Sequence, residues 1–177
     1  MRVEVDFEFS SSIMKELSIM RPSWHKIYFG ILQSVVKRCL CIKLQTAAII
    51  VRGSQVIAMG YNGTFSKSLE CMEYWHSYYK KRNILIPFDE WCKTDEFKNL
   101  HREWSKQHEI HAEANALRWI PPADDCVMYT LYSPCISCTK DIIAHNIKTV
   151  YYKHKYKHGC DSIILLHKMG IPCVQVI

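Results

Sequence analysis

The clearest indication of the fold is the sequence CVMYTLYSPCISCTKDIIAHNIKTVYY, which occupies residues 126–152. It begins with an apolar and β-branched run that predicts a strand over 126–132. Ser133 and the proline that follows it are typical of a helix start in which the serine is the N-cap, and they predict a helix over 134–145. A second strand is expected over 149–152. A strand, a helix and a strand of these lengths form a parallel crossover, so the stretch indicates an α/β sheet.

The same alternation of strands and helices extends outward on both sides of this stretch. Period-2 patterns predict strands, and apolar residues at helical spacing predict helices. The further predicted elements are a strand over 3–9, a helix over 24–39, a hairpin of 46–51 and 55–61, a helix over 110–119, a helix over 161–169 and a strand over 173–176. Because the hairpin is antiparallel, we expect a mixed sheet of about five strands in a three-layer α/β/α fold, with helices on both faces. For residues 3–9 a solvated tail is an equally good interpretation.

The length of the chain favours one domain. A chain of 177 residues can bury a core without covalent cross-links, and no low-complexity or Pro/Gly-rich segment divides it. We therefore expect a single domain over 1–177. Residues 1–22 are expected to form an N-terminal extension, and the aromatic-rich residues 64–108 an inserted segment with short helices.

Nine cysteines and nine histidines are the unusual feature of the composition. The odd cysteine number and an N-terminus with charges on alternate residues argue against an oxidised secreted scaffold, so we expect reduced thiols and a cytoplasmic protein. No run approaches the roughly 18 apolar residues that cross a bilayer. Metal binding is therefore the first function to consider. The net charge of +6 suits a polyanion or a phosphorylated small molecule, without choosing between them.

Two short motifs carry potential metal ligands. The first is His111-Ala-Glu113 on the helix predicted over 110–119, and the second is Pro-Cys135-Ile-Ser-Cys138 at the start of the next helix. Because Cys135 and Cys138 are three residues apart in a first helical turn, both sulfurs lie on one face, and the helix N-terminus favours their thiolate forms. One imidazole and two thiolates leave the fourth position of a tetrahedral zinc open to water, as in a catalytic site.

The carboxylate of the first motif then has a chemical role. On a helix, Glu113 points away from the ligand direction of His111, so we expect it to move protons beside the water and not to bind the metal. A lone C-x-x-C is often a structural zinc corner, but H-x-E followed by P-C-x-x-C is the signature of the zinc deaminases, which this sequence therefore resembles. The resemblance implies hydrolysis in which water activated by zinc attacks an amidine-like carbon, and the glutamate carries its proton to the leaving ammonia.

The chain also resembles a narrower family, the deoxycytidylate (dCMP) deaminases, and particularly those of large tailed bacteriophages. The motifs that carry this resemblance are Gly60-Tyr61-Asn62-Gly63 after the second hairpin strand and HEIHAE at 108–113. The similarity extends from about residue 24 to the C-terminus. It implies hydrolysis of dCMP to dUMP and ammonia in nucleotide biosynthesis, by a homo-oligomer that is often a hexamer. It further implies activation by dCTP and inhibition by dTTP, with Mg²⁺ accompanying a triphosphate effector, and host-cell cytoplasm if the protein is phage-encoded.

The resemblance assigns further residues to binding roles. It makes Asn62 a substrate or effector contact and Gly60, Tyr61 and Gly63 effector contacts. The predicted substrate contacts are Asn62, Ala112, Ser133 and Tyr156. Among them, the backbone of Ala112 and the carbonyl of Ser133 are expected to contact the base, and Tyr156 is expected to close over it. Ordinary Asn-Gly turn chemistry and a solvated loop around residue 156 are the alternative interpretations.

Phage members of this family carry a second zinc, and its ligand pattern maps onto four positions of this sequence. These positions are Cys41, Cys71, His101 and Glu109. A closed site of four protein ligands is structural. The alternative is a set of unliganded thiols in a reduced core.

Two other functions remain compatible with the sequence. The first is a polynucleotide deaminase that acts on cytidine or adenosine in single-stranded DNA or RNA, which the positive charge and many aromatic residues would suit. However, no extended basic stripe favours nucleic acid. The second is a zinc-stabilised nucleotide-binding module without catalysis, which would have no use for Glu113 so near the metal. Salt dependence of substrate binding and zinc stoichiometry discriminate these possibilities.

Overall fold

The protein is described by a computed structural model that covers residues 21–123, 125–157 and 159–177. The strand predicted over 3–9 lies outside these residues. A five-stranded sheet has the order β2-β1-β5-β6-β7. Its strands are β1 (Ala47–Arg52), β2 (Gln55–Tyr61), β5 (Cys126–Tyr132), β6 (Thr149–His154) and β7 (Cys173–Gln175). Strand β1 is antiparallel to β2 and β5, whereas β5, β6 and β7 are parallel, so the mixed sheet is confirmed.

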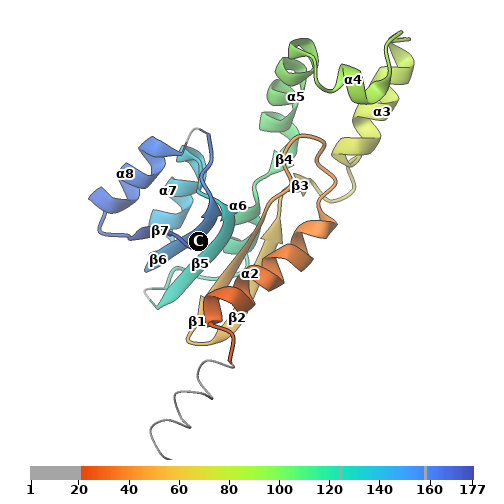
Figure 1. Cartoon of the computed structure of the whole chain (residues 1–177). Coiled ribbons are helices and arrows are strands. Elements are labelled where there is room, and N and C mark those ends of the chain that lie inside the picture. Colours follow the sequence, from red (N-terminus) through yellow and green to blue (C-terminus); the bar gives the residue numbers. More distant parts are fainter. Residues whose placement is uncertain (1–20, 124, 158) are drawn as a thin grey trace, which may run out of the picture.

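Helices cover both faces of this sheet, which confirms the three-layer arrangement (Figure 1). One face is covered by α2 (Trp24–Val35), and the other by α6 (Ala112–Leu117), α7 (Ile136–Ala144) and α8 (Cys160–Lys168). Alternate residues of β1 serve the two layers. Ala47, Ile49 and Val51 pack with the α2 cluster, while Ala48 and Ile50 pack with the cluster under α6, α7 and α8. The alternation of side chains along this interior strand thus contributes to both cores.

Several predicted helix boundaries differ from the structure. The first helix ends at Val35 and continues as the 3₁₀ turn η1 (Val36–Arg38). The helix predicted from 110 begins only at Ala112, because β4 (Glu109–Ile110) pairs with β3 (Gly63–Thr64) in a small second sheet. His111 is therefore the N-cap of α6, with extended backbone angles.

The predicted N-cap of α7 was also wrong. Cys135, not Ser133, is the N-cap, and the helix begins at residue 136. The hydroxyl of Ser133 accepts a hydrogen bond from the backbone N–H of Tyr156 at 2.8 Å instead. A partner distant in sequence has thus taken the oxygen that a local pattern assigned to the helix.

The inserted segment contains short helices, as predicted. They are α3 (Cys71–Lys81), α4 (Phe88–Trp91) and α5 (Asp95–His108). Figure 1 shows them projecting from the sheet beyond β3 and β4. They share an aromatic cluster around Trp75, Trp91 and Phe97, which is separate from the two clusters of the sheet. Within the described ranges, no helix combines the length and apolar character needed to cross a bilayer.

Candidate active site and second donor group

The first donor group comprises His111, Cys135 and Cys138, and we call it the catalytic group. Nδ1 of His111 lies 3.2 Å from Sγ of Cys138 and 3.4 Å from Sγ of Cys135. The three ligand atoms lie within 4.8 Å of one another. His111 and Cys135 are the N-caps of α6 and α7, so the starts of two helices bring the motifs together.

The electrostatics of the catalytic group suit a divalent cation. Hydrogen bonds from the Cys138 thiol and from the His111 ring lower the pKa of Cys135 to about 3. The hydrogen bond to Cys135 raises the pKa of His111 to about 9. These shifts favour a thiolate beside a protonated imidazole, and a metal ion that binds such donors displaces the proton. Two sulfurs and one imidazole nitrogen are ligands that zinc prefers.

Glu113 lies beside the catalytic group on the first turn of α6. Its side chain is 6% exposed. Burial raises the pKa of its carboxyl group. Its oxygens are not among the three converging donor atoms, and a carboxyl group in this position can act as a general acid and base. The geometry therefore suits proton transfer beside the donors.

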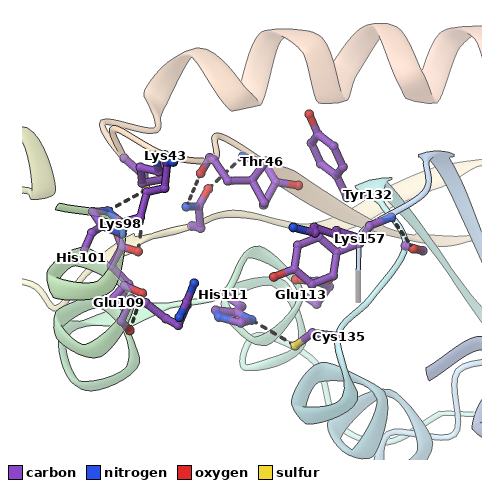
Figure 2. A pocket seen from close by; sticks show the side chains of 17 residues that line it. Lys43, Thr46, Lys98, His101, Glu109, His111, Glu113, Tyr132, Cys135 and Lys157 are labelled. Carbon is purple, nitrogen blue, oxygen red and sulfur yellow. Dashed lines mark hydrogen bonds between the residues drawn. The ribbon is translucent and has the colours of Figure 1, made fainter. Parts of the chain in front are cut away.

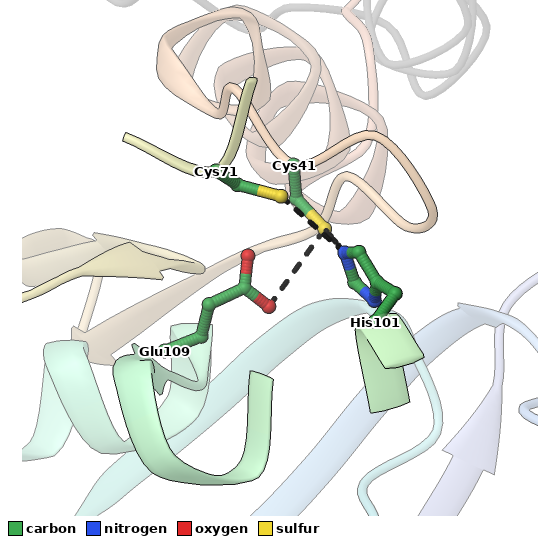
Figure 3. A group of neighbouring side chains, drawn as sticks. All are labelled: Cys41, Cys71, His101 and Glu109. Carbon is green, nitrogen blue, oxygen red and sulfur yellow. Dashed lines mark hydrogen bonds between the residues drawn. The ribbon is translucent and has the colours of Figure 1, made fainter. Parts of the chain in front are cut away.

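The second donor group comprises one residue from each of four segments: Cys41, Cys71, His101 and Glu109. Sγ of Cys71 lies 3.3 Å from Nε2 of His101. Sγ of Cys41 lies 3.7 Å from the same nitrogen and 3.8 Å from Oε2 of Glu109. Figure 3 shows the four side chains pointing toward a common centre. All four ligand atoms lie within 4.8 Å, and only Glu109 is not fully buried.

One oxygen of the second group is left without a partner. Oε1 of Glu109 is buried and accepts no hydrogen bond in the described part of the chain. Burial, together with the charge of Cys41, raises the pKa of Glu109 to about 8. A hydrogen bond from Cys71 lowers the pKa of Cys41 to about 3. An uncompensated buried carboxylate is costly, so a cation among these four donors would relieve it.

A cavity of about 350 Å³ lies between the two donor groups and is lined by residues from both (Figure 2). The predicted residues that line it are Asn62, Glu109, His111, Glu113, Ser133, Cys135, Tyr156, Cys41 and His101. The backbone of Ala112 and the residues Gly60, Tyr61 and Gly63 do not line it. Three of the four predicted substrate contacts, Asn62, Ser133 and Tyr156, thus line one cavity. Of the predicted effector contacts, only Asn62 lines it.

The side chain of Asn62 is engaged in the wall of this cavity. Oδ1 accepts hydrogen bonds from the backbone N–H of Thr46 at 2.8 Å and from the thiol of Cys39 at 3.0 Å. Nδ2 donates to the carbonyl of Leu44 at 2.8 Å. These bonds join the loop before β1 to the end of β2. No acceptor among the described residues takes the second N–H of the amide, which can therefore serve a molecule in the cavity.

Gly60 has a packing role. A Cβ atom on this residue would lie 2.5 Å from the carbonyl oxygen of Ala112 and 2.6 Å from the backbone nitrogen of Ala116. Asn115 donates a hydrogen bond to the carbonyl of Tyr61 at 2.9 Å. Glycine thus allows β2 to approach the helix that carries Glu113. Effector binding at residues 60–63 stays a prediction from the family resemblance.

Several cationic side chains of the cavity were missed by the sequence analysis. They are Lys43, Lys98, Arg102 and Lys157. Lys98, His101 and Arg102 are separated by three and four residues, which places them on one side of a helix. That spacing was the available signal. It was not decisive, because charged residues at the same spacing also occur on solvated faces.

The comparisons with known proteins agree with this geometry. The sequence model of the cytidine and deoxycytidylate deaminase zinc-binding region matches residues 22–154. ComE operon protein 2 of Bacillus subtilis is 30% identical over 160 residues, which cover 88% of this chain and 72% of that protein. Deoxycytidylate deaminase of Enterobacteria phage T4 is 30% identical over 158 residues, which cover 77% of this chain and 81% of that enzyme.

A solved structure supports the fold. The crystal structure of dCMP deaminase from the cyanophage S-TIM5, in complex with dCMP and dUMP, superposes with a TM-score of 0.65 at 23% identity. The match covers 89% of this chain and 99% of that chain. The three-layer fold, the donor set and the family match together define a zinc-dependent hydrolytic deaminase. The chain belongs to the cytidine and deoxycytidylate deaminase family.

Proposed function

We propose that this chain hydrolyses dCMP to dUMP and ammonia. The observation that carries the proposal is the catalytic group, with Glu113 buried beside it, at the wall of a cavity that also carries cationic side chains. The T4 relative is named deoxycytidylate deaminase, and the S-TIM5 enzyme was solved with dCMP and dUMP. A base at the donors and a phosphate among the cations would fit this cavity.

In this proposal His111, Cys135 and Cys138 hold a zinc ion, which would supply the Lewis acid that makes water nucleophilic at neutral pH. Glu113 takes the proton of the attacking water as the oxygen bonds to C4 of the cytosine ring. The carboxyl group then gives this proton to N3, and it later takes the remaining proton from the new hydroxyl group on C4 and passes it to the amino group. The C4–N4 bond breaks, ammonia leaves and the carbonyl of uracil remains.

The other side chains of the cavity orient the nucleotide. The amide of Asn62 is available to the sugar and the carbonyl of Ser133 to the edge of the base, since both residues line the cavity, whereas Ala112 does not line it. Tyr156 would cover the ring, since its side chain lines the same cavity. Each of these groups acts by position, so their loss should affect binding more than the proton transfer.

We also propose that the second donor group binds a structural zinc ion. Four donors from four segments and the unpartnered oxygen of Glu109 support this assignment. A closed set of ligands leaves no position for water. The ion would tie α3 and α5 to the base of α6.

Other properties remain predictions from the family resemblance or from composition. They are activation by dCTP, inhibition by dTTP, Mg²⁺ with a triphosphate effector, assembly into a hexamer, a single domain over 1–177 and a cytoplasmic location. Sigmoidal rate curves that dCTP makes hyperbolic would support the effectors.

The substitution Glu113→Gln tests the function. Activity on dCMP should fall by a factor of at least about 10² to 10⁴, because general acid–base catalysis contributes that much. Zinc content should stay the same, since the glutamate is not a donor of the catalytic group. Undiminished ammonia release would contradict the proposal. A panel of dCMP, deoxycytidine, dCTP and single-stranded DNA would separate a nucleotide enzyme from a polynucleotide enzyme, and turnover of none of them by the zinc-loaded protein would indicate a binding module.

A further inference from the structure

Helix α5 presents one side to the active-site cavity. Lys98, His101, Arg102 and Ser105 all line the cavity and lie at positions i, i+3, i+4 and i+7 of the helix. His101 is buried and belongs to the second donor group, whereas Lys98 and Arg102 are exposed. The inserted segment therefore brings cations to a cavity whose catalytic donors come from another part of the chain. That part is the five-stranded sheet with α2, α6, α7 and α8, which we call the sheet domain.

The cavity carries more positive than negative charge outside the donor groups. Its carboxylates are Glu109 and Glu113, and each lies in or beside a donor group. Its cations are Lys43, Lys98, Arg102 and Lys157. Among the residues that the structure describes, Lys98 forms an ion pair with Asp95 at 2.6 Å, and no ion pair is found for the other three. An anionic ligand group would therefore be favoured in this cavity.

The cations of α5 and the catalytic group lie at different parts of the cavity. Figure 2 shows Lys98 beside His101 at one end and Cys135 toward the other. Tyr156 lies within reach of both parts. Burial raises the pKa of Tyr156, and among the charged groups Cys135 raises it further while Arg102 lowers it. Arg102 is thus close enough to the covering tyrosine to act electrostatically on it.

We propose that α5 forms the phosphate subsite of the enzyme, in which Arg102 and Lys98 bind the 5′-phosphate and determine specificity for a nucleoside monophosphate. This inference rests on the proposed function. The base of a nucleotide at the catalytic donors would place the sugar in the middle of the cavity and the phosphate at the cations of α5. A planar guanidinium binds two phosphate oxygens at once, so Arg102 makes the larger contribution.

A competing explanation is that these cations only offset the negative charge of the second donor group. Two thiolates and a carboxylate around one divalent ion would leave a net negative charge. In that case, removal of the cations would lower the metal content of the protein and would affect phosphorylated and unphosphorylated substrates alike. The two explanations therefore differ in measurable ways.

The first test compares Arg102→Ala and Lys98→Ala with Lys106→Ala. Lys106 lies on the same helix, pairs with Glu103 at 2.8 Å and does not line the cavity, so it controls for loss of one positive charge from α5. For Arg102→Ala, KM for dCMP should rise about tenfold to a hundredfold, with kcat much less affected, because a hydrogen bond to a charged group is lost. The ratio of kcat/KM for dCMP to that for deoxycytidine should fall by the same factor. Lys98→Ala should lower this ratio less than Arg102→Ala does, and Lys106→Ala should leave the ratio unchanged.

The second test measures binding without turnover. Calorimetric titration of dCMP into the zinc-loaded Glu113→Gln protein, with and without Arg102→Ala, should show the same loss of affinity, and zinc per chain should stay constant. The inference is overturned by equal losses for dCMP and deoxycytidine, by no change for dCMP, or by loss of zinc. If the wild type does not deaminate dCMP, the proposed function fails, and the titration still decides whether Arg102 binds the phosphate. If the wild type deaminates dCMP and Arg102→Ala does not change the ratio, only this inference fails.

Discussion

Both donor groups contain two cysteines and one histidine, and the second group adds a glutamate, but their settings in the protein are opposite. The catalytic group takes its donors from the starts of two helices, and its histidine is exposed to the cavity. The second group takes its donors from four segments between residues 41 and 109, and three of them are buried. Three donors leave a position for a reactant, whereas four donors close the site. The exposure and the number of the donors, more than their residue types, therefore distinguish a catalytic metal site from a structural one.

The surroundings of the two groups differ as well. The catalytic group rests on helices that pack over the aliphatic core, with Ala112, Ala116 and Ile142 buried. The second group adjoins an aromatic cluster, in which Trp75 stacks on His101 with ring centroids 5.9 Å apart. We expect the sheet domain to fold without its metal ion, because its core is large. The insert has a small core, so its stability should depend on the second group.

The largest effect is expected from opening the catalytic group. Cys135→Ser should remove the catalytic zinc and lower activity on dCMP about a thousandfold or more, since a metal ion supplies several kcal/mol of transition-state stabilisation. Metal analysis should fall from two zinc ions per chain to one, with the melting temperature of the sheet domain little changed. Cys160→Ser, at an exposed cysteine outside both groups, is the matched control. Loss of both ions would contradict the independence of the two groups.

Local patterns in the sequence were sufficient for most of the fold. The strand predicted over 126–132 and the hairpin arms agree with the structure to within one residue, because alternating side chains specify both faces of a strand. The residues of both donor groups were also identified from the sequence, the catalytic group from spacing and the second from the family resemblance. The structure brings each set together within 4.8 Å.

Features that depend on distant contacts were not predictable. The start of α6 moved because Glu109 and Ile110 pair with a strand more than forty residues earlier, β3 (Gly63–Thr64). Ser133 lost its predicted capping role to the backbone of Tyr156. Arg102 gained its place in the cavity only through the packing of the insert against the sheet domain. No periodicity within one segment contains such information.

An intermediate effect is expected from opening the second group. Cys71→Ser should release the second zinc and leave His101 and the buried Oε1 of Glu109 without a cation, which costs roughly 3–5 kcal/mol in comparable buried charge sites. The insert should melt at a lower temperature, followed by tryptophan fluorescence, because Trp75 stacks on His101. Activity should fall less than in Cys135→Ser, since the catalytic group is intact.

The control for this variant is Cys92→Ser, a half-buried thiol of the insert outside the donor group. It should retain two zinc ions and the wild-type melting curve. If Cys71→Ser kept its second zinc and its stability, the four residues would be an unliganded cluster, and the contrast between the two groups would disappear.

The smallest effect is expected at Ser133, which lines the cavity beside the catalytic group. The catalytic group has three donors and, over the described residues, no fourth protein ligand, and here the loop that carries Tyr156 packs next to it. The hydroxyl of Ser133 accepts the N–H of Tyr156 at 2.8 Å, and a Cβ on Gly159 would lie 2.6 Å from the same oxygen, so the loop packs tightly onto it. Ser133→Ala removes the hydroxyl but keeps the carbonyl proposed to contact the base. Loss of the hydrogen bond to a buried donor costs about 1–3 kcal/mol. We therefore expect a several-fold rise in KM for dCMP with unchanged zinc content. Ser137→Ala, at an exposed position of α7, should leave both unchanged and serves as the control. A loss of zinc, or a fall in kcat as large as that of Glu113→Gln, would contradict this expectation. Either result would mean that the hydroxyl of Ser133 helps to hold the catalytic group in place and does not only position the loop of Tyr156.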